Sequence, residues 1–179
     1  MQDFYTLNVA GLTRQLPICP INEKLYIAGF VMFSDVELTV RCAEELIKKI
    51  PECDVIVTAE SKGIPLAYEM AKQLGIKYIV ARKKVKAYMQ NPISVNVHSI
   101  TTAGTQTLIL DREEADFLTG KRVVIVDDVI STGESLIAIE SLLKEAKANV
   151  IAKSAVLAEG DASERKDIIY LEKLPLFFK

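Results

Sequence analysis

The chain has 179 residues, half of them hydrophobic and 26% charged, with a formal net charge of −2 and only three cysteines. These values predict one folded cytoplasmic domain with reduced thiols, and they argue against binding to nucleic acid or anionic membranes, which favours basic proteins. No apolar run approaches the roughly 18 residues that a membrane helix needs, and the start of the chain lacks the basic and apolar parts of a signal peptide.

Strand and helix patterns alternate along the sequence after an apolar first segment, residues 1–34, which we expect to form a loop-rich cap. The expected helices have apolar residues on one face and cover residues 35–50, 63–74 and 135–147. Short apolar runs predict strands at residues 54–60, 77–82, 107–110, 123–126, 154–158 and 167–171. Residues 83–106 are polar and irregular, and so long a connection in a compact domain is usually a functional loop. The alternation predicts an α/β fold with a mostly parallel sheet flanked by helices.

The stretch VVIVDDVISTGES, residues 123–135, places two adjacent acids, Asp127 and Asp128, directly after an expected buried strand. Ligands of open α/β sheets bind beyond the carboxyl ends of the strands, which is where these acids stand. The turn that follows starts a helix, and the unsatisfied backbone N–H groups and the dipole of a helix start attract anions. Gly133 gives this turn backbone freedom. Further hydrogen-bond donors are the hydroxyls of Ser131, Thr132 and Ser135, so the turn predicts a cup for a phosphate monoester.

Asp127 and Asp128 would repel a phosphate, so we expect them to contact another part of the same ligand. Carboxylates accept hydrogen bonds from sugar hydroxyls, and a sugar beside a phosphate describes a ribose 5-phosphate. A turn of this kind also caps helices in proteins that bind no ligand there. The buried strand, the double acid and the hydroxyl-rich turn in this order favour a ligand site over a simple cap.

The thirteen residues 123–135 resemble the phosphoribosyl-pyrophosphate (PRPP) signature of the type I phosphoribosyltransferases. Glu134 departs from that pattern, in which a small residue is more usual. The resemblance implies that Asp127 and Asp128 hold the ribose hydroxyls. It also implies that the 5-phosphate is held by Ser131, Thr132, Gly133, Glu134 and Ser135.

The same resemblance implies the fold and the domain organisation. The type I phosphoribosyltransferase fold has a central, mostly parallel sheet flanked by helices, with a small hood from the N-terminal region. We therefore expect a single domain, residues 1–179, with the hood at about residues 1–34 and the core at about residues 35–179.

PRPP also carries a pyrophosphate, which leaves in the reaction, so a second anion site is required. The segment TAESKGIP, residues 58–65, lies between an expected strand and an expected helix, and Lys62 and Gly63 supply charge and backbone freedom. An ordinary turn with a surface lysine is the alternative interpretation. The family's pyrophosphate loop has this place in chain order, and the positions that match it are Glu60, Ser61, Lys62 and Gly63.

Four cations occur in the five residues 82–86, and alone they would indicate a solvated face or a nucleic-acid patch. Beside a pyrophosphate site, however, cations offset negative charge on the leaving group. Purine-salvage members of the family carry a similar run before a mobile loop, which residues 87–106 resemble. We therefore expect Arg82 to bind pyrophosphate and the catalytic residues to be Lys83, Lys84, Lys86 and Asp127. His98 is the only histidine, and a single loop histidine is more often incidental than catalytic.

The purine itself stays open at this stage. Residues 54–135 resemble adenine, xanthine and archaeal hypoxanthine/guanine phosphoribosyltransferases. Adenine enzymes commonly carry an acid before the loop glycine, where this chain has Thr101, Thr102 and Ala103. The lysine expected of a xanthine enzyme is absent from residues 158–161. Candidates to stack on the base are Tyr26, Phe30 and Phe33 of the hood, although core packing explains these aromatic residues equally well.

The resemblance thus implies a purine phosphoribosyltransferase that makes a nucleotide and pyrophosphate from PRPP and a free base, with adenine favoured. The alternatives are hypoxanthine, guanine or xanthine as the base. Mg²⁺ is expected to arrive bound through PRPP and pyrophosphate rather than through protein ligands alone. Family enzymes are usually dimers with shared loops, which implies a homodimer.

A regulator that keeps the fold as a PRPP sensor without catalysis is the alternative from another class. About 34 residues precede the first expected helix, too few for a full winged-helix module, and the chain is mildly acidic. Both features weaken this alternative.

Overall fold

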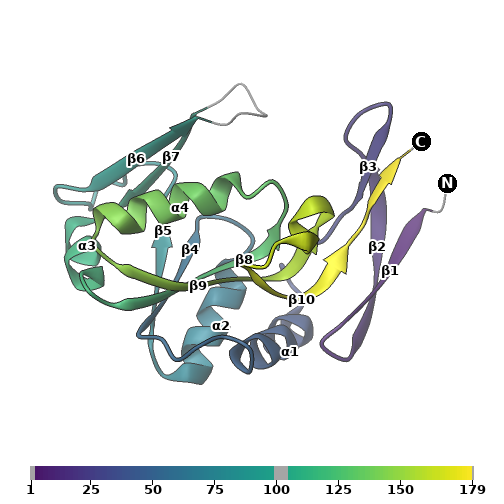
Figure 1. Ribbon diagram of the computed structural model, residues 1–179, viewed down its shortest axis with the longest axis horizontal. Coiled ribbons are helices and arrows are strands. Elements are labelled where there is room, and N and C mark those ends of the chain that lie inside the picture. Colours follow the sequence, from purple (N-terminus) through teal and green to yellow (C-terminus); the bar gives the residue numbers. More distant parts are fainter. Residues whose placement is uncertain (1–2, 99–104, 179) are drawn as a thin grey trace.

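The computed structural model of the chain describes residues 3–98 and 105–178 (Figure 1). The helices are α1 (Val36–Ile47), α2 (Ile64–Leu74), α3 (Arg112–Leu118), α4 (Glu134–Glu145) and a 3₁₀ turn, η1 (Gly160–Glu164). The core strands are β4 (Val55–Ala59), β5 (Lys77–Ala81), β8 (Arg122–Ile130), β9 (Asn149–Glu159) and β10 (Ile169–Leu174). The other strands are β1 (Phe4–Val9), β2 (Leu12–Pro20), β3 (Leu25–Ala28), β6 (Ile93–His98), β7 (Thr105–Leu110) and β11 (Leu176–Phe178). None of the described helices is both long and apolar enough to span a membrane.

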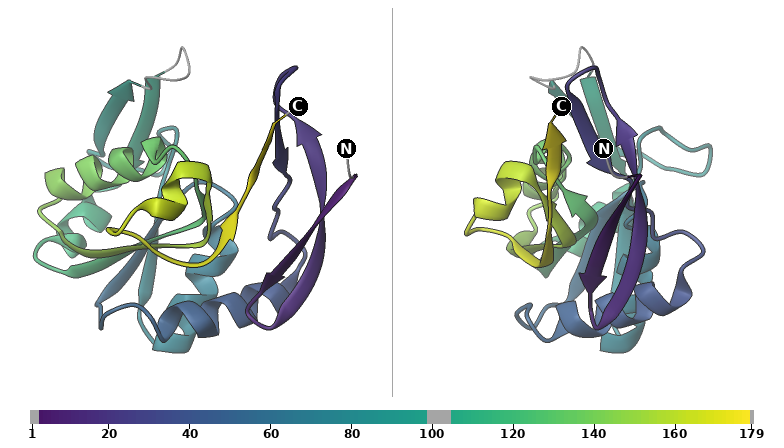
Figure 2. Two further views of the ribbon diagram at one scale, coloured as in Figure 1. Left: turned by 45° about the vertical axis from the view of Figure 1, so that its right-hand side comes forward. Right: turned by 90° about the vertical axis from the view of Figure 1, so that its right-hand side faces the viewer.

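The core is a five-stranded sheet in the order β10-β9-β8-β4-β5, and every neighbouring pair is parallel. Helices α1 and α2 cover one face and α3 and α4 the other (Figures 1 and 2). The chain leaves β4 toward β5 through α2, and it leaves β8 toward β9 through α4. The winding therefore reverses between β4 and β8, which is the place where sheets of this kind bind ligands. This architecture confirms the expected α/β fold.

The side chains of β8 alternate between the two faces of the sheet. The α3/α4 side takes Val123 and Ile125, and the α1/α2 side takes Val124 and Val126. The same alternation directs Asp127 toward α4 and Asp128 toward the α1/α2 side. Because β8 continues to Ile130, both acids lie within the strand rather than after it, beyond its last pair with β4.

The first segment of the chain forms a sheet, so the expectation of a loop-rich cap was wrong. β1, β2 and β3 form antiparallel pairs, and β11 from the other end of the chain completes the order β1-β2-β3-β11. This hood stands beside the core in the left view of Figure 2, and in the right view it lies in front of the core. Apolar hood residues join the same buried cluster as α1 and α2: Leu7, Val9 and Leu16. The hood therefore includes residues 176–178 in addition to strands from the first 34 residues.

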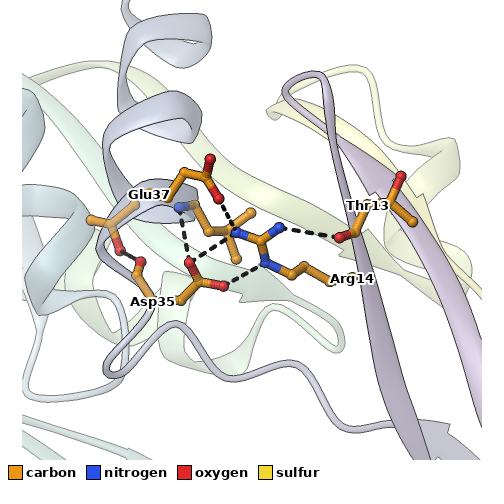
Figure 3. Close-up of polar contacts among 6 residues, drawn as sticks. Thr13, Arg14, Asp35 and Glu37 are labelled. Carbon is orange, nitrogen blue, oxygen red and sulfur yellow. Dashed lines mark hydrogen bonds and ion pairs between the residues drawn. The ribbon is translucent and has the colours of Figure 1, made fainter.

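An arginine of β2 ties the hood to the start of α1 (Figure 3). Arg14 Nε donates to Asp35 Oδ2 at 2.7 Å, and its Nη2 donates to Asp35 Oδ1 at 3.1 Å and to Glu37 Oε2 at 2.8 Å. Asp35 is also the N-cap of α1, where its Oδ1 accepts from the backbone N–H of Leu38. The Arg14 guanidinium holds the pKa of Asp35 below its usual range. One carboxylate thus caps α1 and anchors the hood.

Residues 83–106, expected to be irregular, contain an antiparallel hairpin of β6 and β7, whose tip lies outside the described residues. Backbone hydrogen bonds in both directions between Arg82 and Ile109 join β7 to the end of β5. α3 has no counterpart among the expected elements. It begins with a capping box: the side chain of Asp111 accepts a hydrogen bond from the backbone N–H of Glu114, and the side chain of Glu114 accepts one from the backbone N–H of Asp111.

Candidate functional site

Two adjoining cavities share the side chains of Asp127 and Ser135. The first, of about 120 Å³, is enclosed by the end of β8, the turn after it and the first turns of α4. The second, of about 270 Å³, is lined by Ala59, Ser61, Lys83, Thr107, Leu108, Asp127 and Ser135. The two expected anion sites, residues 58–65 and 131–135, are therefore neighbours on either side of Asp127.

The turn between β8 and α4 has the form expected of an anion cup. Gly133 is the N-cap of α4 with a φ of 81°, a left-handed conformation that favours glycine. No side chain caps the helix, and the backbone N–H of Glu134 meets Thr132 Oγ1 only at 3.5 Å. All five residues 131–135 line the first cavity. The start of α4 is therefore directed at this cavity rather than satisfied by a capping side chain, which favours the anion site over a simple cap.

The two acids have different environments, because Asp127 lines both cavities and Asp128 lines neither. Asp127 Oδ1 accepts hydrogen bonds from Ser61 Oγ at 3.2 Å and from the backbone N–H of Asp128 at 2.9 Å. Burial and, second, the charge of Asp128 raise the pKa of Asp127 to about 7. Asp128 is 5% exposed, and its buried Oδ2 has no hydrogen-bond partner among the described residues. Such an oxygen calls for a donor from elsewhere.

Lys62 connects Asp128 to the hood. Its Nζ donates to the backbone carbonyl of Phe30 at 3.1 Å and lies 3.6 Å from Asp128 Oδ2. The second distance allows an ion pair but is too long for a hydrogen bond, so the buried oxygen still lacks a donor. Lys62 thus contacts the hood side of the site, whereas its neighbour Ser61 lines the second cavity. The expected contact of Lys62 with pyrophosphate stays a prediction.

A glycine is needed at position 63 because there is no room for a Cβ, and not because of the backbone freedom that the sequence suggested. Its φ of −73° is open to any residue. A Cβ at this position would lie 2.9 Å from Asp127 Oδ1, 3.0 Å from Thr58 Oγ1 and 3.1 Å from Asp127 Cα. The last of these atoms is backbone and cannot move aside cheaply. The glycine therefore lets the β4–α2 turn approach β8 closely enough to place Ser61 against Asp127.

Glu60 organises the basic segment 82–86. Its Oε1 lies 3.2 Å from Lys86 Nζ and 3.5 Å from Arg82 Nη1. Its Oε2 accepts from the backbone N–H of Lys83 at 3.0 Å, and this bond, with the nearby cations, lowers the pKa of Glu60. Of the four cations in the segment, Lys83 lines the second cavity. The Glu60 carboxylate thus positions cations, and Lys83 is the cation placed for direct contact with a ligand.

The aromatic residues proposed to stack on a base differ in exposure. Phe30 is 3% exposed, so its ring belongs to the core. Tyr26 of β3 is partly buried and pairs in register with Phe177 of β11. Phe33 is 53% exposed and lines an apolar hollow between the start of α1 and α2. Contact of these rings with a base stays a prediction, for which Phe33 offers more surface than Phe30.

Several residues beside the cavities had no role in the sequence expectations, among them Thr107, Leu108 and Arg165. Thr107 and Leu108 line the second cavity from β7, and an apolar strand pattern does not reveal which residues face a site. Arg165 lies against Gly133, and no local motif links residues so far apart in the chain. The loop positions that bear on the choice of base, residues 101–103, lie outside the described residues. His98 ends β6, and no role follows for it.

Comparison with known proteins identifies the class to which this fold and site belong. The family model described as the phosphoribosyl transferase domain matches residues 35–175. The chain therefore belongs to the phosphoribosyl transferase domain family, and its expected membership in the purine-salvage branch agrees with the relatives that follow.

The relatives are purine enzymes and a purine regulator. The hypoxanthine/guanine phosphoribosyltransferase of Methanothermobacter thermautotrophicus is 31% identical over 134 residues, which cover 74% of this chain and 66% of that protein. The purine biosynthesis transcriptional repressor PurR of Bacillus subtilis is 32% identical over 125 residues, 70% of this chain and 43% of the repressor. The chain thus spans less than two thirds of the length of both curated relatives.

A solved structure supports the fold independently. The crystal structure of the adenine phosphoribosyltransferase of Thermoanaerobacter pseudethanolicus matches with a TM-score of 0.73 at 23% identity. The match covers 88% of this chain and 95% of that one. It extends the likeness beyond the residues of the family model to most of the described chain.

Proposed function

We propose that the chain is an enzyme that transfers the 5-phosphoribosyl group of PRPP to a purine base and releases pyrophosphate. The observation that carries this proposal is the pair of cavities that meet at Asp127 and Ser135. One is enclosed by the start of α4, which suits a phosphate monoester, and the other by the β4–α2 turn and Lys83, which suits a pyrophosphate. PRPP carries both of these anions on one ribose.

In this proposal the ribose lies over the acids, between the two anions. Asp127 borders both cavities and is the acid placed to accept a hydrogen bond from a ribose hydroxyl there. Asp128 lines neither cavity, so its contact with the ribose stays a prediction. Ser61 and Lys83 hold the pyrophosphate, with Arg82 and Lys86 adding positive charge behind them. The turn 131–135 holds the 5-phosphate.

Catalysis comes from positioning and from stabilisation of the leaving group. The bond between ribose C1 and the pyrophosphate oxygen breaks as a bond forms from C1 to a purine nitrogen, whose proton passes to solvent. A hydrated Mg²⁺ would be held mainly through PRPP, with the carboxylate oxygens of Asp127 and Asp128 suited to its waters, and it would supply positive charge beside the pyrophosphate. Among the residues that the structure describes, no group of three or more His, Cys, Asp or Glu side chains could hold a metal.

We further propose adenine as the base. β9 ends at Glu159, and Asp161 follows in η1. A Cβ on the intervening Gly160 would lie 2.8 Å from Leu176 of the hood, so these acids lie near the junction of hood and core. Carboxylates accept a hydrogen bond from an exocyclic amine and repel a 6-oxo group. Hypoxanthine or guanine is the second candidate, favoured by the Methanothermobacter relative, and xanthine is a third.

A direct assay tests the enzyme and names the base. The protein is incubated with PRPP, Mg²⁺ and one of adenine, hypoxanthine, guanine or xanthine, and both pyrophosphate and nucleotide are followed. We expect both products in equal amounts with adenine. Equal products with another base only would reject adenine and retain the enzyme. Tight PRPP binding without turnover on any base would favour the regulator, the alternative that the likeness to PurR supports.

We also propose that the enzyme is a cytoplasmic homodimer. The three cysteines are free thiols, as a reducing compartment requires. Tyr68 of α2 and Tyr78 of β5 are exposed and stack edge to face with their ring centroids 5.9 Å apart. Exposed aromatic residues of this kind are enriched at subunit contacts. Light scattering on the purified chain gives the oligomeric state.

A further inference from the structure

Arg165 lies against the turn of the proposed phosphate cup, although it comes from a distant part of the chain and does not line the first cavity. It follows η1, and a Cβ built on Gly133 would lie 2.6 Å from Arg165 Nη1. The guanidinium therefore packs directly against the turn. Gly133 is buried although its neighbours Ser131 and Thr132 are exposed, which agrees with a side chain covering it.

The guanidinium is held in a fixed orientation. Arg165 Nε donates to Asp167 Oδ1 at 2.9 Å, and Nη2 donates to Asp167 Oδ2 at 2.7 Å. These two bonds use one edge of the guanidinium and leave Nη1 on the side of Gly133. The hydrogen bonds to Asp167 also raise the pKa of Arg165, so the group is charged at any physiological pH.

Asp167 is itself fixed to α4 through a lysine. Lys153 Nζ donates to Asp167 Oδ2 at 2.7 Å and to Glu140 Oε1 of α4 at 3.1 Å. The four side chains alternate in charge and balance one another, with Arg165 at the end nearest the turn. Loss of the Arg165 charge would therefore leave a net negative charge behind the site of an anion.

We propose that Arg165 is a positioning residue for the 5-phosphate, in addition to the residues of the turn. It holds the left-handed conformation at Gly133 from outside and adds positive charge to that of the start of α4. This inference rests on the proposed function, because it assigns the first cavity to the phosphate of PRPP. It concerns a residue outside the signature motif.

The test measures binding of ribose 5-phosphate and of pyrophosphate separately, by calorimetry on the full chain. Arg165→Gln is expected to weaken the binding of ribose 5-phosphate about tenfold, because a nearby positive charge is lost. It should weaken the binding of pyrophosphate by less than about twofold. Arg165→Lys keeps the charge without the planar fork and should recover part of the loss. In kinetics, Arg165→Gln should raise the KM for PRPP more than it lowers kcat.

Arg122→Gln is the matched control. Arg122 makes the same kind of two-point contact with Asp54, but it stands at the amino end of β8, away from both cavities. We expect it to bind both ligands within about twofold of the unchanged protein. If Arg165 had only a structural role, Arg165→Gln would lose the same affinity for both ligands, or Arg165→Gln and Arg122→Gln would lose the same affinity for ribose 5-phosphate.

The inference is overturned if Arg165→Gln binds ribose 5-phosphate like the unchanged protein, or loses both anions equally. If the unchanged protein binds neither PRPP nor ribose 5-phosphate, the assignment of the phosphate cup fails, and with it the proposed function. The unchanged protein thus reports on the function, and the variant reports on Arg165.

Discussion

At the scale of single residues, the burial of the Asp127 carboxylate carries a cost in stability. Its carboxylate is buried beside Asp128, and burial raises its pKa to about 7. Below the unfolded-state pKa of about 4, a carboxyl whose pKa is raised by folding is protonated in both states and does not change the free energy of unfolding. As the pH rises from there to the folded-state pKa, ionisation favours the unfolded chain and lowers the free energy of unfolding progressively. The instability that Asp127 causes should therefore grow between about pH 4 and pH 7 and level off above that.

Asp127→Asn removes the charge and keeps the Oδ1 acceptor for Ser61. We expect the variant to be more stable than the unchanged protein by on the order of 1–3 kcal/mol at pH 8, with the difference shrinking toward pH 4. Its turnover of PRPP should fall by about a hundredfold or more, because the carboxylate no longer accepts ribose hydroxyls. Urea unfolding at several pH values and the purine assay measure the two effects. A variant with full turnover would show that Asp127 is not part of the site.

Residues of the site were predictable from sequence where a local motif carries the chemistry, and not where the fold brings distant parts together. The double acid, Ser61 and Lys83 were expected, and the structure places three of them on the cavities: Ser61, Lys83 and Asp127. The alternation of β8 then separates Asp128 from Asp127, a consequence of strand geometry that the motif alone did not reveal. Arg165 lies 32 positions after Gly133, and only the folded chain places it there.

At the scale of elements, the segment after β5 divides its cations between two tasks. Lys83 lines the second cavity, and Arg82 and Lys86 pair with Glu60. Lys83→Gln should therefore raise the KM for PRPP and weaken the binding of pyrophosphate about tenfold, because it removes the cation that lies within reach of that anion. Lys84, exposed and outside the lining of that cavity, is the neighbouring comparison.

Lys84→Gln should have the smaller effect, because Lys84 is exposed and does not line the second cavity. Calorimetry with pyrophosphate and steady-state kinetics on both variants make the comparison. Equal losses in the two variants would mean that the segment acts through its total charge, and that the position of Lys83 in the cavity does not matter.

Elements were predictable where their periodic signal was strong. The helices α1, α2 and α4 and the strands β4 and β5 lie close to their expected ranges. β8 continues four residues beyond its expected end at residue 126, and β9 begins five residues before its expected start at residue 154. α3 was missed although Asp111 and Glu114 form the Asp-x-x-Glu signature of a capping box, a signal present in the sequence. β6 was missed although Ile93 and Val95 alternate with polar residues as a half-buried strand does. α3 is short, and β6 has three apolar residues among its six whereas β4 and β5 each have four among five, so the apolar patterns of the missed elements are weak.

At the scale of the whole molecule, the two ends of the chain meet in the hood. β11 pairs with β3, and its Phe177 ring contacts the ring of Tyr5 in β1, with centroids 5.8 Å apart. No local pattern could predict this pairing, because it joins segments from opposite ends of the sequence. β11 thus adds a fourth strand to the sheet that β1, β2 and β3 form, and it ties residues 176–178 to the hood.

Phe177→Ala tests whether the hood holds the base independently of the PRPP site. Phe177 packs against the cluster that joins hood and core, whereas the adjacent Phe178 is 73% exposed. Loss of the half-buried ring should cost about 1–3 kcal/mol of local stability, seen as faster hydrogen exchange in β1 and β3, while Phe178→Ala should change stability by less than about 0.5 kcal/mol. If the hood positions the purine and the core positions PRPP, Phe177→Ala will raise the KM for the base and leave PRPP binding nearly unchanged. An equal loss of affinity for the base and for PRPP would mean instead that hood and core act as one cooperative unit. The Arg14–Asp35 ion pair would then transmit disorder of the hood to α1.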